Sequence, residues 1–423
     1  MSELVDPDKL RLDIMKDAEL KRDFRMKMAE CYDKILELSK RYLDMQEEQY
    51  HVITTWIIGT YFHESFPAYP FLFFNAMKGS GKTRALKFIS ALGNKGDGSV
   101  QNNLTEAVIF RIPRNTTTCI DEIEQIGSKD KQTLRELLND AYKKGMKVKR
   151  MRKVKLQGGS EQQVVECFEP YYPIAMANIW GMDEVLGDRS ITLILEKSSC
   201  ERVTLLFEDF DNPEFQELKR TLEKFSVVSV NDVAKKTYKE WNNWVLSMYT
   251  SSYNTYNTYT TLTTLNPTEK LQQLELEEVF LKIKNLGISG RNFELLMPLL
   301  LVNNMLSEEH FDRFLSIGKN LMETKKEDEY ASSKDVTLYD FVANWADDSD
   351  FKPIKALVQE FRLFCGDGEQ DDRWLNDRWL GKALTRLSLI VKKRRIASGV
   401  EVIVNKKKAQ EKLRIFKEVE VKK

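Results

Sequence analysis

The side chains best suited to chemistry stand in one octapeptide, Ala76-Met-Lys-Gly-Ser-Gly-Lys-Thr83. Gly79 and Gly81 allow consecutive backbone N–H groups to turn toward one phosphate, as a phosphate-binding loop requires. Lys82 is expected to reach the β- and γ-phosphates, and the hydroxyl of Thr83 to bind Mg²⁺. An alanine stands at the first position, where glycine is usual, and a Gly/Lys surface turn is the alternative. The pattern predicts a nucleoside triphosphate site.

Two adjacent acids, Asp121 and Glu122, end a β-branched run over residues 116–120. Carboxylates at the end of a buried strand need a cation, because burial of an unpaired charge is costly. Asp121 is expected to hold Mg²⁺ through water, and Glu122 to orient and deprotonate the attacking water. The alternative is an acidic helix start that includes Glu124 and Asp130. The predicted nucleotide ligands are Gly79, Ser80, Gly81, Lys82, Thr83 and Asp121, with Thr83 and Asp121 on the metal.

Two later residues complete the predicted catalytic set with Glu122. Asn178 ends a short apolar run, where a polar side chain can contact the γ-phosphate and the attacking water; a simple turn residue is the alternative. Arg189 begins the next run, within Gly187-Asp-Arg-Ser190. It is a candidate arginine finger that acts on the ATP of a neighbouring subunit, and a surface pair with Asp188 is the alternative.

The elements that must position these residues follow from hydrophobic periodicity. Short apolar or β-branched runs predict strands, and helical spacing predicts helices between and around them. The strands are expected at residues 69–75, 116–120, 173–177 and 190–195, and the helices over about 1–62, 84–92, 104–111, 129–144, beyond 197 and about 269–320. This alternation indicates an α/β fold with a mainly parallel sheet covered on both faces.

A basic hairpin is predicted between the acids and Asn178. Residues 146–154 and 163–168 flank Gln157-Gly-Gly-Ser160, a flexible tip. Basic side chains beside such a tip suit a loop that grips a phosphate backbone. The alternative is a solvated hairpin whose charges only prevent edge pairing. The DNA contacts predicted here are Lys149, Lys153 and Lys155.

The C-terminal part is the most basic, with 16 basic and five acidic residues from Arg373 to Lys423. A helix over 353–364, a helix over 375–387 and a hairpin over 389–404 resemble a winged-helix domain. Its second helix and wing would meet nucleic acid, or the wing docks on the acidic residues 327–335 of the same chain. The predicted contacts are Arg378, Lys382, Arg386, Lys393 and Arg394.

The ordered motifs over residues 50–197 resemble those of AAA+ ATPases. The hairpin between acids and asparagine resembles the pre-sensor hairpin of hexameric replicative helicases. The motif wording is closest to ATPases of phages, plasmids and integrated elements, including primase-linked helicases. The resemblance implies ATP and Mg²⁺ as cofactors, a subunit interface at Arg189 and a homo-hexameric ring. The arginine that senses γ-phosphate from the lid helix is not identifiable.

The composition limits the class of protein further. Five scattered cysteines without a CxxC pair and three histidines argue against a disulfide framework or zinc site. No signal peptide or apolar run of membrane-spanning length is seen, which favours a cytoplasmic protein without membrane contact. The expected divisions are a helical region 1–62, an AAA+-type core 63–200, a helical middle region 201–345 with a Tyr/Thr/Asn-rich linker 249–266, and a basic winged-helix-like domain 346–423. A second polar connection is expected over 325–350.

These features predict a ring-forming ATPase that moves on or unwinds DNA, single-stranded or duplex, with replication proteins as partners. Two alternatives remain. One is a replication initiator or loader that uses ATP as a switch without translocating. The other is a protein-remodelling ATPase, although the predicted hairpin tip has no aromatic residue to grip a polypeptide.

Overall fold

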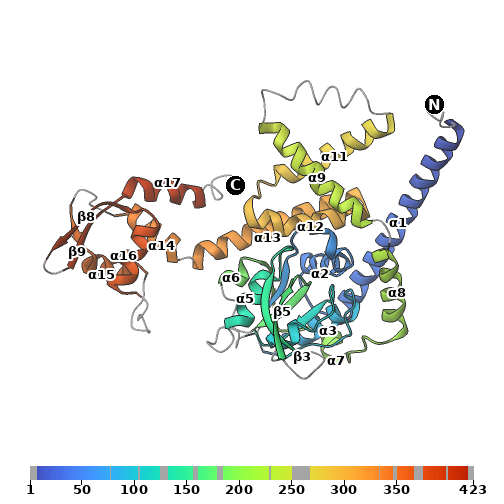
Figure 1. The fold of residues 1–423 in the computed structure, drawn as a ribbon, viewed down its shortest axis with the longest axis horizontal. Coiled ribbons are helices and arrows are strands. Elements are labelled where there is room, and N and C mark those ends of the chain that lie inside the picture. The colour runs from blue at the N-terminus through green and yellow to red at the C-terminus, as the bar shows by residue number, and fades with distance from the viewer. Residues whose placement is uncertain are drawn as a thin grey trace. The chain divides into compact units, whose positions relative to one another are not determined.

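The chain forms two compact units, residues 1–322 and 323–423 (Figure 1). The computed structural model describes residues 7–76, 78–102, 105–123, 132–155, 161–178, 184–227, 230–249, 267–332, 334–345, 350–365, 375–396 and 399–417. Within these ranges no helix is long and apolar enough to cross a membrane.

A four-stranded parallel sheet forms the centre of the first unit. Its order is β2 (Thr118–Ile120), β5 (Ile174–Asn178), β1 (Phe71–Ala76) and β6 (Ser190–Leu195). Each strand overlaps a run predicted to be a strand, with β1 and β5 ending one residue later than predicted, and the parallel α/β core is confirmed. A parallel bridge between Gln101 and Ile120 extends the sheet beyond β2.

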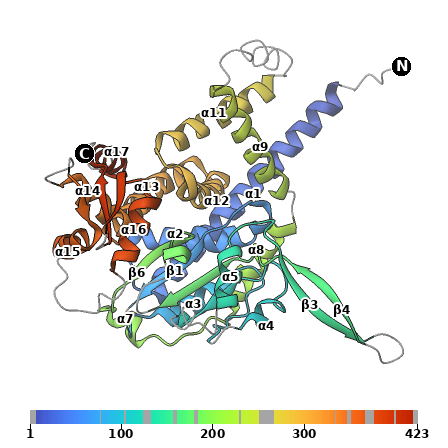
Figure 2. The same cartoon turned by 60° about the vertical axis from the view of Figure 1, so that its left-hand side comes forward.

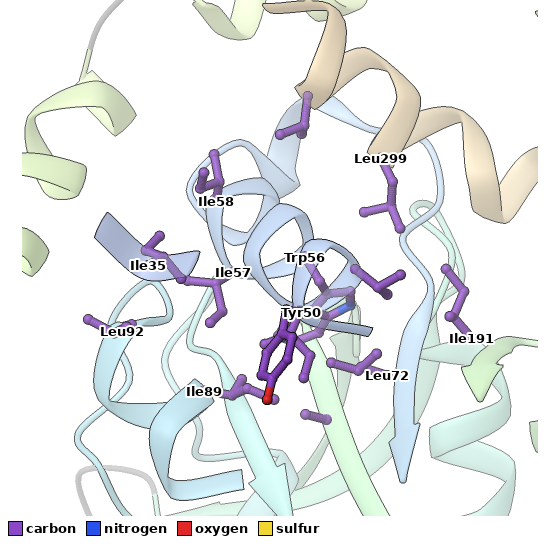
Figure 3. Packing of buried hydrophobic residues seen from close by; sticks show 14 of the residues in the cluster. Ile35, Tyr50, Trp56, Ile57, Ile58, Leu72, Ile89, Leu92, Ile191 and Leu299 are labelled. Atoms are coloured by element: carbon purple, nitrogen blue, oxygen red, sulfur yellow. The ribbon is translucent and has the colours of Figure 1, made fainter. Parts of the chain in front are cut away.

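Side chains of β1 alternate between two apolar layers, as expected for a strand buried on both faces. Leu72 and Phe74 pack in the layer formed with α2 (Glu47–Thr60) and α3 (Lys82–Leu92). Phe71 and Phe73 pack on the other face with α5 (Gln132–Asp140). Figure 3 shows the first layer, in which Trp56 and Ile89 close around the strand.

The predicted N-terminal and middle regions share this first layer. It receives side chains from α1 (Pro7–Tyr42), α8 (Pro213–Val227), α12 (Gly290–Leu306) and α13 (Glu308–Ser332) as well as from α2. Beside them, α9 (Val230–Tyr249) meets α11 (Pro267–Asn285) through aromatic rings, and the Trp241 ring stands 5.1 Å from both Phe280 and Phe293. The helices therefore cover the sheet and do not form a separate N-terminal domain.

The basic hairpin forms as predicted. β3 (Val148–Lys155) and β4 (Glu161–Phe168) pair antiparallel as a separate two-stranded sheet, and Figure 2 shows them running together away from the parallel sheet. The predicted tip and most of the predicted linker, residues 250–266, lie outside the described residues. Short helices complete the unit: η1 (His63–Ser65), α4 (Glu106–Ile109), α6 (Glu184–Gly187) and α7 (Glu201–Leu205).

The second unit contains the predicted succession of helix, helix and hairpin. These elements are α15 (Ile354–Cys365), α16 (Asp377–Arg386), β8 (Ile390–Ile396) and β9 (Gly399–Val404), and the short β7 (Lys352–Pro353) pairs with β9. Two further helices join them, α14 (Lys334–Ala343) and α17 (Lys406–Lys417).

The polar connection expected over residues 325–350 is wrong for most of its length. α13 continues to Ser332, and α14 occupies Lys334–Ala343. Leu338 and Val342 of α14 are buried in the core of the second unit. The few apolar residues of this segment stand among many acids, so their helical spacing is hard to recognise in the sequence. Packing against α17 stabilises the helix where local propensity is weak.

Candidate nucleotide-binding site

The phosphate-loop candidate connects β1 to α3, the strand and helix that its chemistry requires. Gly79 and Gly81 have φ values of +81° and +88°, where a side chain would be strained. Gly81 is the N-cap of α3, and neither a side-chain cap bond nor an acidic residue occupies the first turn. The N–H groups at this helix end can therefore bind an anion.

Lys82, Thr83 and Asp121 meet at this helix end. Thr83 Oγ1 donates a hydrogen bond to Asp121 Oδ2 at 2.6 Å, and Lys82 Nζ lies 2.9 Å from Oδ1. Asp121 is only 5% exposed. It follows β2, which is separated from β1 by β5, so the sheet brings together residues 38 positions apart. The structure thus brings these three predicted site residues together.

Two polar atoms of the loop are buried without a hydrogen-bond partner, Ser80 Oγ and Lys82 Nζ. The contact between Lys82 and Asp121 is an ion pair without hydrogen-bond geometry. Buried unsatisfied donors are costly, and the oxygens of a triphosphate would satisfy both. The residues present therefore fit a nucleotide.

A magnesium ion fits the same place. Mg²⁺ is usually held by one or two protein oxygens together with substrate phosphates and water. The hydroxyl of Thr83 and the carboxylate of Asp121 supply such oxygens at one point. No cluster of three or more His, Cys, Asp or Glu occurs in the part of the chain that the structure describes. Phosphate and water oxygens would therefore supply the other ligands of the proposed ion.

Asn178 lies at the same edge of the sheet. It ends β5, between the strands that precede the loop and Asp121, and it is 5% exposed. Its parallel partner on β1 is Asn75, which stands immediately before the loop. Asn75 was not predicted as a site residue, although a polar residue at the end of an apolar strand can mark the edge of the sheet where an active site lies. The structure brings Asn75, Asn178 and Asp121 to the carboxyl ends of three adjacent strands.

Glu122 is exposed, and its backbone is unusual. Its φ is +57°, in the left-handed region that non-glycine residues seldom adopt. Its N–H donates to Asp121 Oδ1 at 2.9 Å. Among the described residues, no hydrogen bond or ion pair joins its carboxylate to the loop. Such outliers concentrate at functional sites.

Arg189 is held by groups of its own chain. Its Nη1 donates to the carbonyl of Val185, and its guanidinium lies 5.2 Å from the centre of the Tyr142 ring. Arg291 stands 5.0 Å from the same ring and 3.1 Å from Asp188. Two arginines, Arg189 and Arg291, therefore lie against one tyrosine ring, and Arg291 forms an ion pair with Asp188. Sequence reasoning missed Tyr142 and Arg291, because residues about 50 and 100 positions away carry no local signal.

The second unit contains a hollow of about 460 Å³ between α16 and the hairpin formed by β8 and β9. Three of the predicted DNA contacts line it: Arg378, Lys382 and Lys393. Arg394 does not line it, because Arg394 pairs with Glu401 at 2.6 Å and its guanidinium lies 4.0 Å from the Phe351 ring centre. Of the two contacts predicted on this hairpin, Lys393 therefore lines the hollow and Arg394 does not.

The remaining predicted DNA contacts are less fully placed. On the hairpin, Lys149 is exposed, and so are the cross-strand neighbours Met151 and Val165. The side chains of Lys153, Lys155 and Arg386 lie outside what the structure describes. The hairpin thus offers a basic strand whose charges suit contact with phosphates, with exposed apolar side chains between them.

Comparisons with protein-family models, with curated proteins and with solved structures found no match to this chain.

Proposed function

We propose that this protein is an ATP-hydrolysing motor that forms a homo-hexameric ring, as its resemblance implies, and acts on DNA during replication of a mobile element. The observation that carries the proposal is the junction of Lys82, Thr83 and Asp121 at the start of α3. Local spacing alone does not produce this junction; it needs a sheet in which β2 and β1 end at one edge.

The roles of the residues follow from their positions. The loop N–H groups and Lys82 bind the phosphates, while Thr83 and Asp121 hold Mg²⁺. When bound, Mg²⁺ neutralises charge on the phosphates during transfer to water. Asn178 lies at the edge where the attacking water would stand, and Glu122 follows Asp121 as the group that activates it. Arg189 is proposed to act on the site of an adjacent subunit.

Two basic surfaces support DNA as the substrate: the β3–β4 hairpin and the hollow beside α16. In the chain the hairpin lies between Asp121 and Asn178, because it follows β2 and α5 and β4 leads into β5. Movement of the nucleotide site can therefore be passed to the hairpin. A loader that uses ATP only as a switch is the second candidate, favoured by the basic hollow in a unit of its own.

The test is the ATPase rate of the full chain with and without single-stranded DNA. Lys82→Ala is expected to abolish hydrolysis, and Lys78→Ala is the matched control, because Lys78 is exposed in the same loop. Glu122→Gln is expected to bind ATP but to hydrolyse it on the order of a thousand-fold more slowly. Single-stranded DNA is expected to stimulate the wild-type rate.

Three results separate the candidates. Equal rates for Lys82→Ala and wild type would exclude the nucleotide site. Hydrolysis that no nucleic acid changes would exclude the motor and favour protein remodelling. Slow hydrolysis with tight, ATP-dependent binding to one duplex site, without strand separation, would favour the loader.

A further inference from the structure

An exposed aromatic side chain lies beside the start of α3. Phe207 has 90% of its surface exposed, the largest value for any large hydrophobic residue that the structure describes. Its neighbour Leu206 and the nearby Phe210 pack against the core instead. A phenyl ring in water forgoes the favourable free energy of burial, so its outward position calls for a reason.

The residues on both sides of Phe207 are tied to α3. Arg84 Nη1 donates to the carbonyl of Val203 at 2.5 Å, and its Nη2 to that of Leu206 at 2.8 Å. On the other side, Glu208 pairs with Lys87 at 2.8 Å. Arg84 and Lys87 belong to the first two turns of α3, the helix whose first residue is Lys82. The chain is therefore held against the phosphate-binding end of this helix.

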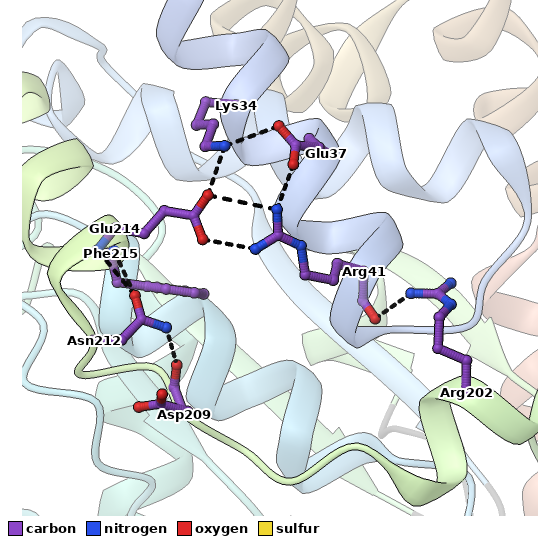
Figure 4. Close-up of polar contacts among 8 residues, drawn as sticks. All are labelled: Lys34, Glu37, Arg41, Arg202, Asp209, Asn212, Glu214 and Phe215. Carbon is purple, nitrogen blue, oxygen red and sulfur yellow. Dashed lines mark hydrogen bonds and ion pairs between the residues drawn. The ribbon is translucent and has the colours of Figure 1, made fainter.

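A second set of contacts fixes the same segment to α1, as Figure 4 shows. Arg202 Nη1 donates to the carbonyl of Arg41 at 2.6 Å, and Arg41 Nη1 lies 2.7 Å from Glu214 Oε2. The segment from 202 to 214 is thus anchored before, beside and after Phe207. Such anchoring presents one aromatic face at a set place instead of leaving it on a loose loop.

We propose that Phe207 stacks on the base of the nucleotide whose phosphates bind at the start of α3, an inference that rests on the proposed ATP binding. Arg84 stands two residues after Lys82, about 3 Å along the helix axis. Because Arg84 lies in the first turn of α3 and holds the carbonyl of Leu206, the residue before Phe207 lies beside the start of that helix. An aromatic ring binds the flat face of a base by stacking and needs no specific hydrogen bonds. Phe207 thereby distinguishes a nucleotide from a bare triphosphate.

The experiment compares two ligands, ATP and inorganic tripolyphosphate, by calorimetry on the full chain. Phe207→Ala is expected to weaken ATP binding about 5- to 150-fold, the range for loss of one base–aromatic stack. It should leave tripolyphosphate affinity within about two-fold, because the phosphate contacts remain. Phe207→Trp is expected to restore ATP affinity. Leu205→Ala, at a residue 70% exposed in the same segment, is the matched control and should change neither.

Each other outcome overturns the inference in a recognisable way. Unchanged ATP affinity in Phe207→Ala, with wild-type tripolyphosphate affinity, overturns the stacking role alone. An altered oligomeric state at unchanged ATP affinity assigns Phe207 to a contact between copies. Equal loss of both ligands assigns it to the structure of the loop. Failure of the wild type to bind either ligand overturns the proposed function, and the inference with it.

Discussion

At the scale of single residues, the candidate site depends on charges and donors that the protein itself leaves incompletely satisfied. Asp121 receives the hydroxyl of Thr83 and faces the ammonium of Lys82. Lys82 Nζ and Ser80 Oγ still lack hydrogen-bond acceptors. The oxygens of a triphosphate would accept hydrogen bonds from both groups. Part of the binding free energy would then come from relieving the cost of burying these donors without partners.

His63 provides a residue-scale prediction about pH. It is 1% exposed, its ring stacks on Tyr171 at 3.9 Å, and burial, with help from Lys144, lowers its pKa to about 3. Histidine in the unfolded chain titrates near 6.5, so the unfolded state binds more protons below that pH. The free energy of unfolding should therefore fall as pH decreases below about 6.5, by up to about 1.4 kcal/mol per pH unit from this group.

The variant His63→Phe isolates this effect, because a phenyl ring can stack on Tyr171 without titrating. Urea unfolding at pH 7.5, 6.5 and 5.5 should show the variant gaining stability relative to wild type as pH falls. His51 and His310 also have lowered pKa values through burial, and they remain in both proteins. A constant difference between the two proteins at all three pH values would contradict the assignment to His63.

At the scale of elements, a buried polar contact joins α2 to α12 behind the sheet. Asn303 is completely buried, and its Nδ2 donates to Thr55 Oγ1 at 3.1 Å and to the carbonyl of Leu299 at 2.8 Å. The neighbouring hydroxyl of Thr54 is buried without a partner. Two adjacent threonines of one helix thus have opposite hydrogen-bond status.

The same substitution at these two positions should have opposite effects. Thr55→Val removes a partner of the buried Asn303 side chain and is expected to destabilise the protein by about 1–3 kcal/mol. Thr54→Val removes an unsatisfied buried hydroxyl without changing volume much, so we expect no loss or a small gain. Denaturant unfolding measures both. An equal loss in the two variants would mean that packing, not hydrogen bonding, governs this contact.

The sequence predicts an element where the residues of that element themselves carry the pattern. β1 and β5 were predictable because continuous apolar runs mark strands buried on both faces. The order of the strands could not be predicted, because no residue of β5 indicates that this strand lies between β1 and β2. For the same reason Asn178 could be proposed by position, whereas its pairing with Asn75 could not.

At the scale of the molecule, the second unit follows the unit with the candidate nucleotide site in the chain, and its hollow can be tested separately. Lys382→Ala should weaken binding of duplex DNA and reduce the slope of log affinity against log salt by about 0.9 if it contacts one phosphate. Arg394→Ala is the matched control, because Arg394 is paired with Glu401 and does not line the hollow. Fluorescence anisotropy of the full chain across salt concentrations gives both slopes. Equal slopes for Lys382→Ala and wild type would remove this residue from the interface.

The proposed ring makes a prediction that no isolated subunit can satisfy. Arg189→Ala keeps its own Lys82, Asp121 and Glu122, whereas Glu122→Gln keeps Arg189. If Arg189 acts on the adjacent subunit, mixed rings contain sites with Glu122 from one variant and Arg189 from the other. An equal random mixture should then recover about a quarter of the wild-type ATPase rate, although each variant alone is nearly inactive.

The control for this mixture is Arg189→Ala combined with the double variant Arg189→Ala/Glu122→Gln, which cannot supply the arginine from either side. Arg189 and Arg291 both lie against Tyr142, so Arg291→Ala should test whether the neighbouring guanidinium can substitute. Absence of recovery in the first mixture, with mixed rings shown by sedimentation, would place the action of Arg189 within its own subunit. Recovery would require that the site beginning at Lys82 is completed by a second copy of the chain, because no single protomer in that mixture holds both groups.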